Sequence, residues 1–355
     1  MQQLFPEHSV PQTTLMSVKR ALQLVASFGL SVALLALLVK IAKIDVRLTL
    51  QQLRAVSWIA FTKIVLLSCL FNLLSTEKWR SIDATLRRPK DSVPSRADSF
   101  AFTSAGVALG IFLPAQFAVA TARTLGTYFH GGALRRGTAG TLYEQSFDVA
   151  TACLLAVASA LTWFYKGGGL MWTISAVSML CVALVAVGPS VRLIRWLAAK
   201  SFVRTVAPQG RIAAILRSLS DLLHSDLLNT GLVRRLLGLS VARFAVIVVT
   251  SRETADAIGL SIPIWSMAAA IPFVMLMAVV AFTPGGLGMN EFTAASALSL
   301  FGTAFTIGAS WTLANRILVT ISYFVVAVGA AAILGIRRVT AAKWGSAIEE
   351  RPRCS

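Results

Sequence analysis

Charged side chains that could bind or transform a ligand lie inside segments that are otherwise apolar. Glu144 and Asp148 are four positions apart, which places both carboxylates on one face of a helix. Arg316 separates two long uncharged runs, and Glu291 ends the longest run in the chain. A charge at the centre of a membrane helix costs about 2.5–3.5 kcal/mol on insertion scales, which makes such residues candidates for function. With Arg123 they predict a buried, paired, polar cavity; the alternative is interhelical ion pairs that only fix packing.

The end of the longest uncharged run is rich in residues that break a helix. Its proline and glycines are Pro284, Gly285, Gly286 and Gly288. A turn of this kind leaves backbone N–H groups uncovered, and a helix beginning at about Met289 would add the positive end of its dipole. The stretch therefore predicts a site for an anion such as phosphate, with Glu291 either neutralising the dipole or pairing with an arginine. Close packing of membrane helices is the alternative explanation for the glycines.

Other residue types that support catalysis or metal binding form no pattern. The three histidines are scattered, and none has a cysteine or carboxylate at the spacing of a metal site. Cys69, Cys153 and Cys181 lie inside apolar segments, so neither a disulfide framework nor a metal cluster is indicated. We therefore expect no cofactor, no metal and no enzymatic activity.

The composition is that of a membrane protein. Hydrophobic residues make up 56% of the 355 positions and charged residues only 14%, with a mean hydropathy of +0.73. Several uncharged runs reach the roughly 20 residues that a helix needs to cross a bilayer. The runs are Leu22–Val39, Phe100–Ala122, Val149–Tyr165, Leu170–Val191, Ala257–Asn290, Phe292–Asn315 and Ile317–Ile336. No segment alternates as in a membrane β-barrel, so we predict an all-α polytopic membrane protein with about seven to nine membrane helices.

The formal charge of +18 comes mainly from basic residues between the apolar runs. Such residues set orientation and meet anionic lipid, so we expect a multi-pass protein of the bacterial inner membrane with both termini cytoplasmic and no nucleic-acid partner. Lys63 and Arg243 lie in two weaker spans and are expected to reach the interface. The expected organisation is a disordered tail at 1–18, one transmembrane domain at 19–336 with an amphipathic segment at about 192–235, and a basic tail at 337–355.

Two basic segments conflict with a chain in which every apolar run crosses the membrane once. Glu77–Asp98 and Arg192–Arg235 would then lie on opposite faces, whereas the positive-inside rule places both in the cytoplasm. The conflict disappears if Phe100–Ala122 enters and leaves from one face, with a break at Pro114. The helix after Pro284 is also short for a crossing, so we predict two proline-broken re-entrant elements, the arrangement of a mid-membrane site in transporters with inverted repeats. Chance similarity of the two sequences is the alternative to a repeat.

Four motifs resemble those of the lysylphosphatidylglycerol synthase transmembrane-region family, also called flippase-like membrane proteins. They are "LPAQFAVATAR" (Leu113–Arg123), "YEQSFD" (Tyr143–Asp148), "TPGGLGMNE" (Thr283–Glu291) and "ANR" (Ala314–Arg316). The sequence departs from the family pattern at Gln145 and Asn290, where the family usually has arginine, and at 118–120, which lacks the usual glycine and acid. These departures imply a changed head-group preference or reduced activity. We do not expect this sequence to form the family's cytosolic synthase domain, so aminoacyl transfer is not among the expected activities.

The resemblance implies that the polar cavity holds a lipid head group and that the protein moves an anionic or glycosylated lipid between leaflets. The glycine amides and Arg123 or Arg316 would bind phosphate, and Asn315 would belong to the same binding site. Glu144, Asp148 and Glu291 would pair these arginines or bind cationic parts of the ligand. One alternative is a membrane glycosyltransferase with a polyprenyl-linked donor, although 44–56 offers only Asp45 as an early external acid. Another is a non-transporting accessory subunit, whose partner would be a lipid or polysaccharide synthase.

Overall fold

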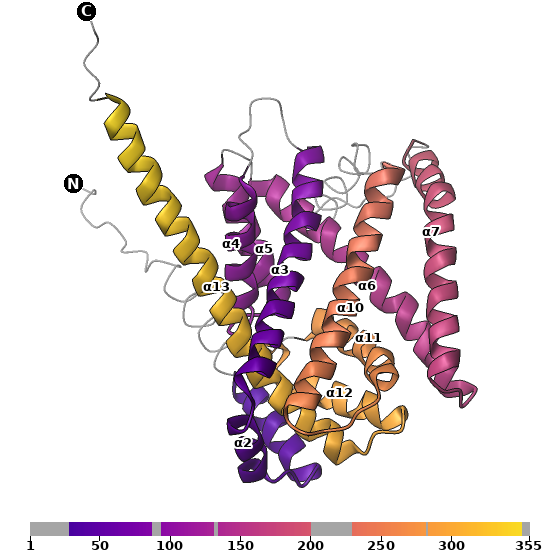
Figure 1. The fold of residues 1–355 in the computed structure, drawn as a ribbon. Helices are drawn as coiled ribbons and strands as arrows, with labels where there is room; N and C mark the ends of the chain where they lie inside the picture. The colour runs from indigo at the N-terminus through magenta and orange to yellow at the C-terminus, as the bar shows by residue number, and fades with distance from the viewer. Residues whose placement is uncertain (1–27, 87–93, 131–133, 200–228, 282, 350–355) are drawn as a thin grey trace, which may run out of the picture.

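The computed structural model describes residues 28–86, 94–130, 134–199, 229–281 and 283–349, which form helices joined by turns (Figure 1). The helices are Phe28–Ile41, α2 (Val46–Arg54), α3 (Trp58–Leu86), α4 (Arg96–Leu109), α5 (Ala115–Phe129), α6 (Leu134–Phe164), α7 (Gly169–Ala199), α10 (Thr230–Ala257), α11 (Ile264–Val280), the 3-10 turn η2 (Pro284–Gly286), α12 (Met289–Leu300) and α13 (Phe305–Glu349). Within the described ranges there is no strand, which confirms the all-α prediction. The predicted tail 1–18, most of the amphipathic segment (200–228) and residues 350–355 lie outside them.

Four helical stretches are long and apolar enough to cross a membrane. They are Trp58–Leu86, Gly137–Phe164, Gly169–Arg192 and Phe305–Gly335, and Phe28–Ile41 and Ile264–Val280 are shorter apolar helices. α10 has 28 residues, which is long enough, but it is less apolar and contains Arg243 near its middle. The chain is a multi-pass membrane protein, and the number of seven to nine membrane helices stays a prediction.

α4 and α5 form an antiparallel helical hairpin. α4 begins at a capping box, in which Ser95 Oγ accepts from the Asp98 N–H at 3.1 Å and Asp98 Oδ2 accepts from the Ser95 N–H at 3.3 Å. The helices approach closely because a Cβ atom on Gly106 would lie 2.9 Å from that of Ala122. With 14 and 15 residues, each helix is about 21–22 Å long, shorter than the hydrocarbon core of a bilayer. The turn between them, 110–114, is the first tip.

α11 and α12 form a second hairpin. Ser266 Oγ donates to the Phe301 carbonyl at 3.0 Å, which places the beginning of α11 beside the end of α12. The turn between them, 283–288, is the second tip. Gly285, Gly286 and Gly288 have φ angles of 57°, 71° and 82° there, a backbone region that favours glycine. The glycines noted in the sequence are therefore required by the turn itself.

The two tips contact each other; the second is mostly buried, whereas Phe112 and Leu113 of the first are exposed. The Gly285 N–H donates to the Leu113 carbonyl at 3.0 Å, and a Cβ on Gly285 would lie 2.9 Å from the Gly110 carbonyl oxygen. The α4–α5 hairpin begins at the end of the bundle where α3 ends, and the α11–α12 hairpin begins at the opposite end (Figure 1). Both proline breaks thus lie at one place in the fold. Entry of the hairpins into a membrane from one face, and their relation by an inverted repeat, stay predictions.

The largest core cluster holds the second hairpin against α6, α10 and α13. It includes Leu155 of α6, Phe244 of α10, Met267 and Leu298 of the hairpin, and Trp311 of α13. The Trp311 indole N–H donates to the Ser251 carbonyl at 3.1 Å, which adds a polar link between α13 and α10. This packing fixes α6 and α10 beside each other, and both contribute side chains to the candidate site.

Candidate functional site

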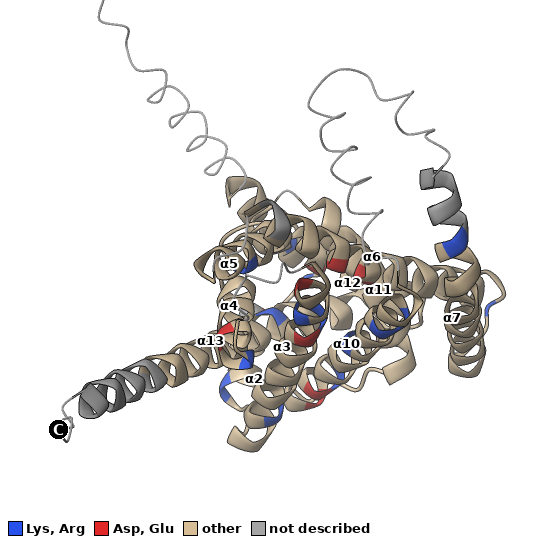
Figure 2. Ribbon diagram, turned by 90° about the horizontal axis from the view of Figure 1, so that it is seen from above, with Lys and Arg blue, Asp and Glu red and all other residues tan. Residues whose placement is uncertain are grey.

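Five charged side chains from four helices form one buried group, named here the charge cluster. Its members are Lys78 of α3, Arg123 of α5, Glu144 and Asp148 of α6, and Arg243 of α10. Lys78, Arg123 and Glu144 are at most 2% exposed. Viewed from above, α3, α6 and α10 lie beside one another and carry both acidic and basic residues (Figure 2). The cluster is therefore in the interior of the helix bundle.

The two carboxylates of the cluster are shared among its three cations. Glu144 pairs with Arg123 and lies 3.9 Å from Lys78 Nζ and 3.8 Å from an Arg243 guanidinium nitrogen. Asp148 lies 2.5 Å from Lys78 Nζ and also pairs with Arg243. The spacing of four residues between Glu144 and Asp148 presents both carboxylates to the same partners, which confirms the prediction of a shared helix face.

With each side chain in its usual ionised form, the charge cluster has one more positive than negative charge. Within the described residues, its side chains form ion pairs only with one another, so three cations face two carboxylates. The Nε atoms of Arg123 and Arg243 are buried and have no hydrogen-bond partner there. A buried charge without full compensation costs several kcal/mol. The cluster could therefore lower its free energy by binding an anion.

Aromatic rings and a backbone carbonyl partly stabilise the two arginines. The Arg243 guanidinium lies over the Phe71 ring at 4.5 Å, and that of Arg123 lies over the Trp79 ring at 5.8 Å. Such cation–π contacts contribute about 0.5–2 kcal/mol each. One Arg123 nitrogen also donates to the Ser75 carbonyl at 3.2 Å. These contacts hold the guanidinium groups in place without neutralising their charge.

The second tip contains a separate carboxylate and arginine. Glu291 is 3% exposed; its Oε2 accepts from the Gly288 N–H at 2.6 Å, and its Oε1 lies 3.7 Å from Arg316 Nε. Arg316 donates to the Gly285 carbonyl at 2.8 Å. Because Gly285 also bonds to Leu113, this network joins both tips to α13. Glu291 thus lies at the start of α12, where it can neutralise the helix dipole, and it also pairs with an arginine. From the sequence alone these two roles are alternatives.

The prediction of uncovered amides at the glycines is wrong. The N–H groups of Gly285 and Gly288 donate to Leu113 and Glu291, and that of Gly286 donates to the Thr283 carbonyl at 2.9 Å. The physical reason is the tightness of the turn. It brings these N–H groups within hydrogen-bond distance of the Thr283 carbonyl, the Glu291 carboxylate and the Leu113 carbonyl of the first tip. Two other polar atoms here, Thr283 Oγ1 and Asn290 Oδ1, are buried without a hydrogen-bond partner in the described part of the chain.

The structure divides the predicted site residues into two groups. Arg123, Glu144 and Asp148 belong to the charge cluster, and the tip group contains Pro114, Pro284, Gly285, Gly286, Gly288, Glu291 and Arg316. Asn315 faces α10 instead, where its Oδ1 accepts from Thr254 Oγ1 at 2.8 Å. Among the described residues no ion pair joins the two groups. The sequence thus identifies members of both groups but not their separation.

Two members of the charge cluster differ from their sequence-based assignment. The sequence places Lys78 in a cytoplasmic loop, but α3 continues to Leu86 and buries it completely. Arg243 is expected to reach the membrane interface, but it turns inward to Asp148 because the carboxylate offers a partner that lipid does not. For Lys78 a signal is present: Trp79 and Ile82 keep α3 apolar at helical spacing beyond Thr76, and both are buried.

Comparison with known proteins agrees with the resemblance seen in the motifs. The sequence model of the family described as lysylphosphatidylglycerol synthase TM region matches residues 24–329, which include both hairpins and the whole charge cluster. Searches of curated proteins and of solved structures found no match. Because the matched segment covers well over half of the chain, this protein belongs to the lysylphosphatidylglycerol synthase TM-region family.

Proposed function

We propose that the protein moves an anionic or glycosylated lipid between the leaflets of the bacterial inner membrane, with the head-group phosphate bound at the charge cluster. The observation that carries this proposal is the unbalanced positive charge among Lys78, Arg123 and Arg243. A phosphodiester has one negative charge, which would balance the cluster. Membership of a flippase-like membrane family supports a lipid as the source of that phosphate.

The exposed side of the charge cluster would receive the head group. The side chains of Asp148 and Arg243 are 19% and 16% exposed, whereas those of Arg123 and Glu144 are 2% exposed. Phosphate oxygens would therefore reach Arg243 first, because the Lys78 side chain is fully buried, and would add to Asp148 as a partner of the cations. Arginine binds phosphate through paired N–H donors, which suits this contact. Arg123 and Glu144 would remain paired behind them and keep the helices in register.

A small cavity of about 70 Å³, with apolar and polar lining residues, lies between α3, α10 and α13. Hydroxyl groups of Ser68, Thr250 and Ser251 line it, together with the Phe71 ring that underlies Arg243. A cavity of this size and polarity has room for water. It also reaches Asn315, the neighbour of Arg316 in α13. The cavity therefore offers a place for water beside the Phe71 ring that underlies Arg243.

The hairpins are the elements that we propose to move. A hydrogen bond from the Gly285 N–H to the Leu113 carbonyl joins the tips, and Arg316 of α13 bonds to the Gly285 carbonyl, so separating the tips would break few hydrogen bonds. Discontinuous helices that meet at mid-membrane serve alternating access in transporters. The ends of α3, α7 and α13 and the beginnings of α4 and α10 lie at one end of the bundle (Figure 1). Because basic residues gather there in the sequence, we propose that this end faces the cytoplasm.

The test is lipid transfer in liposomes that contain the purified protein and either fluorescent phosphatidylglycerol or fluorescent phosphatidylcholine. A membrane-impermeant quencher reports how fast labelled lipid exchanges between leaflets. We expect faster transfer of phosphatidylglycerol, and an Arg243→Gln variant that is slower by about tenfold or more, because a charge-assisted hydrogen bond is worth about 1.5–3 kcal/mol.

Lys63→Gln is the matched control. Lys63 and Glu253 also form an ion pair between α3 and α10, at 3.3 Å, but the lysine side chain is 58% exposed. Its loss should leave the transfer rate unchanged. Equal rates for wild type and Arg243→Gln would contradict the site. Lipid binding by the wild-type protein without transfer would contradict transport and favour the accessory-subunit alternative.

A further inference from the structure

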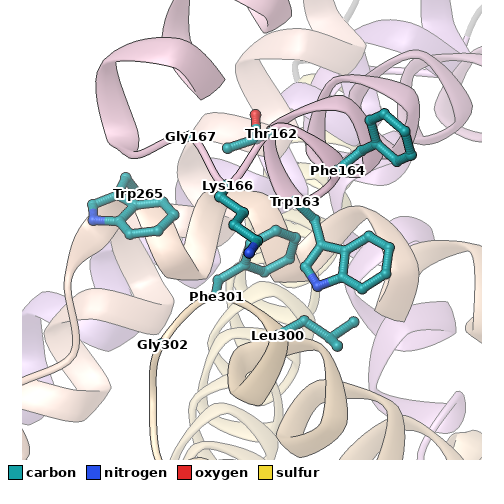
Figure 3. A pocket seen from close by; sticks show the side chains of 9 residues that line it. All are labelled: Thr162, Trp163, Phe164, Lys166, Gly167, Trp265, Leu300, Phe301 and Gly302. Carbon is teal, nitrogen blue, oxygen red and sulfur yellow. The ribbon is translucent and has the colours of Figure 1, made fainter.

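A second candidate site lies at the end of the bundle opposite the predicted cytoplasmic end. A cavity of about 570 Å³ is bounded there by the α6–α7 turn, the start of α11 and the α12–α13 turn. Its walls are largely aromatic and include Trp163, Trp265 and Phe301 (Figure 3). The charge cluster and the tip group contribute none of its lining residues. Its ligand would therefore bind independently of the transport site.

A lysine side chain extends into this cavity. Figure 3 shows the Lys166 side chain reaching into the space between Trp163 and Trp265. Within the described residues the Lys166 ammonium has no ion pair and no hydrogen bond, whereas Lys63 has a carboxylate partner. An exposed ammonium between aromatic walls attracts an anion and has no protein group to satisfy that attraction.

The backbone at Lys166 has a conformation that is unusual for a residue with a side chain. Lys166 follows the last turn of α6 with φ of 50°, and the next residue, Gly167, donates to the Thr162 carbonyl at 2.8 Å. This is the helix-terminating position that is usually glycine, because a side chain there is strained. Glycine occupies the three following positions, 167–169, yet lysine stands at the strained one.

The position of the cavity favours an amphiphilic ligand. It lies between the ends of two candidate membrane spans, Gly137–Phe164 and Gly169–Arg192, and hence at a boundary of the apolar layer. Trp163 and Leu300 are each 54% exposed at its rim, and their apolar surfaces continue onto the outside of the bundle. We infer that this cavity binds a phosphate-bearing lipid, with the phosphate at Lys166 and the acyl chains against the rim.

A photoactivatable phosphatidylglycerol in phosphatidylcholine nanodiscs tests the inference through cross-links mapped by mass spectrometry. We expect cross-links in peptides that contain Trp163 or Leu300, and about fivefold fewer of them in Lys166→Gln, because one basic residue near a membrane surface is worth about 1 kcal/mol. Lys166→Arg should keep them. Excess unlabelled phosphatidylglycerol should compete, whereas inorganic phosphate at matched ionic strength should not.

Lys43→Gln is the control for a general effect of charge. Lys43 also has a positive φ, 48°, also follows a helix and is exposed, but it does not line the cavity. An equal loss of cross-links in Lys43→Gln and Lys166→Gln, or no loss in Lys166→Gln, would overturn the inference. Competition by inorganic phosphate as strong as that by the lipid would overturn the assignment to a lipid. The experiment measures lipid binding at this cavity and not lipid transfer. A failure of the proposed transport function would therefore leave this inference unchanged.

Discussion

The charge cluster and the tip group both contain a buried carboxylate and an arginine, but they differ in charge balance. At the tips Glu291 faces one arginine, and both side chains also bond to the backbone of the turn. In the charge cluster Glu144 is shared by three cations, and the positive charge exceeds the negative. Ion pairs in one membrane bundle can therefore have different roles. The tip pair joins two hairpins, and we propose that the cluster binds an anionic ligand.

Glu144→Gln should give the largest difference in stability between a cluster residue and its control. The change leaves three cations with only Asp148, and removing one partner of a buried ion pair costs about 3–5 kcal/mol. Thermal unfolding in detergent measures the loss. The control is Glu253→Gln, whose side chain is 29% exposed and pairs with Lys63 between α3 and α10; it should cost about 0–1 kcal/mol. Similar losses in the two variants would contradict the buried, shared role of Glu144.

Gly285→Ala should differ from its control by a smaller amount, and this difference is specific to the tips. The residue has φ of 57°, and its new Cβ would contact Arg316 and lie 2.9 Å from the Gly110 carbonyl oxygen. Gly259→Ala is the control, because Gly259 has φ of 74° but open space around its Cβ position. The positive φ costs both variants about 1–3 kcal/mol. Gly285→Ala should lose about 1.5–3 kcal/mol more, the value of the charged hydrogen bond from Arg316.

Unfolding temperatures of the two glycine variants decide this prediction. If Gly285→Ala and Gly259→Ala unfold at the same temperature, the contact between the tips does not stabilise the fold. In that case the tip group would lose its role as the junction of the two hairpins.

The sequence is most informative where single residues determine local structure. Proline and glycine break helices in any surroundings, so Pro114 and Pro284 mark both tips by residue type alone. The spacing of Glu144 and Asp148 likewise places two carboxylates on one helix face. The composition is sufficient for the all-α membrane class, and the motif around Pro284 indicates the family.

Features that depend on contacts between distant segments cannot be predicted in the same way. Lys78 and Arg243 are separated from Asp148 by 70 and 95 positions, and only the packing of α3 and α10 against α6 makes them its partners. Whether the amides of the second tip are covered depends on the first tip, since Gly285 bonds to Leu113. The excess positive charge of the cluster cannot be counted from the sequence for the same reason. Sequence patterns assign Lys78 to a loop and Arg243 to the membrane interface, so neither is expected beside the two carboxylates.

The most direct test of the central claim is a count of charges in the cluster. Lys78→Gln leaves two cations with two carboxylates, whereas the double variant Lys78→Gln with Asp148→Asn again leaves one positive charge in excess. The measurement is phosphatidylglycerol bound per protein in nanodiscs, by native mass spectrometry, with Lys63→Gln as the surface control. We predict that Lys78→Gln weakens binding about tenfold and that the double variant restores most of it. Equal binding by the single and double variants would contradict the account.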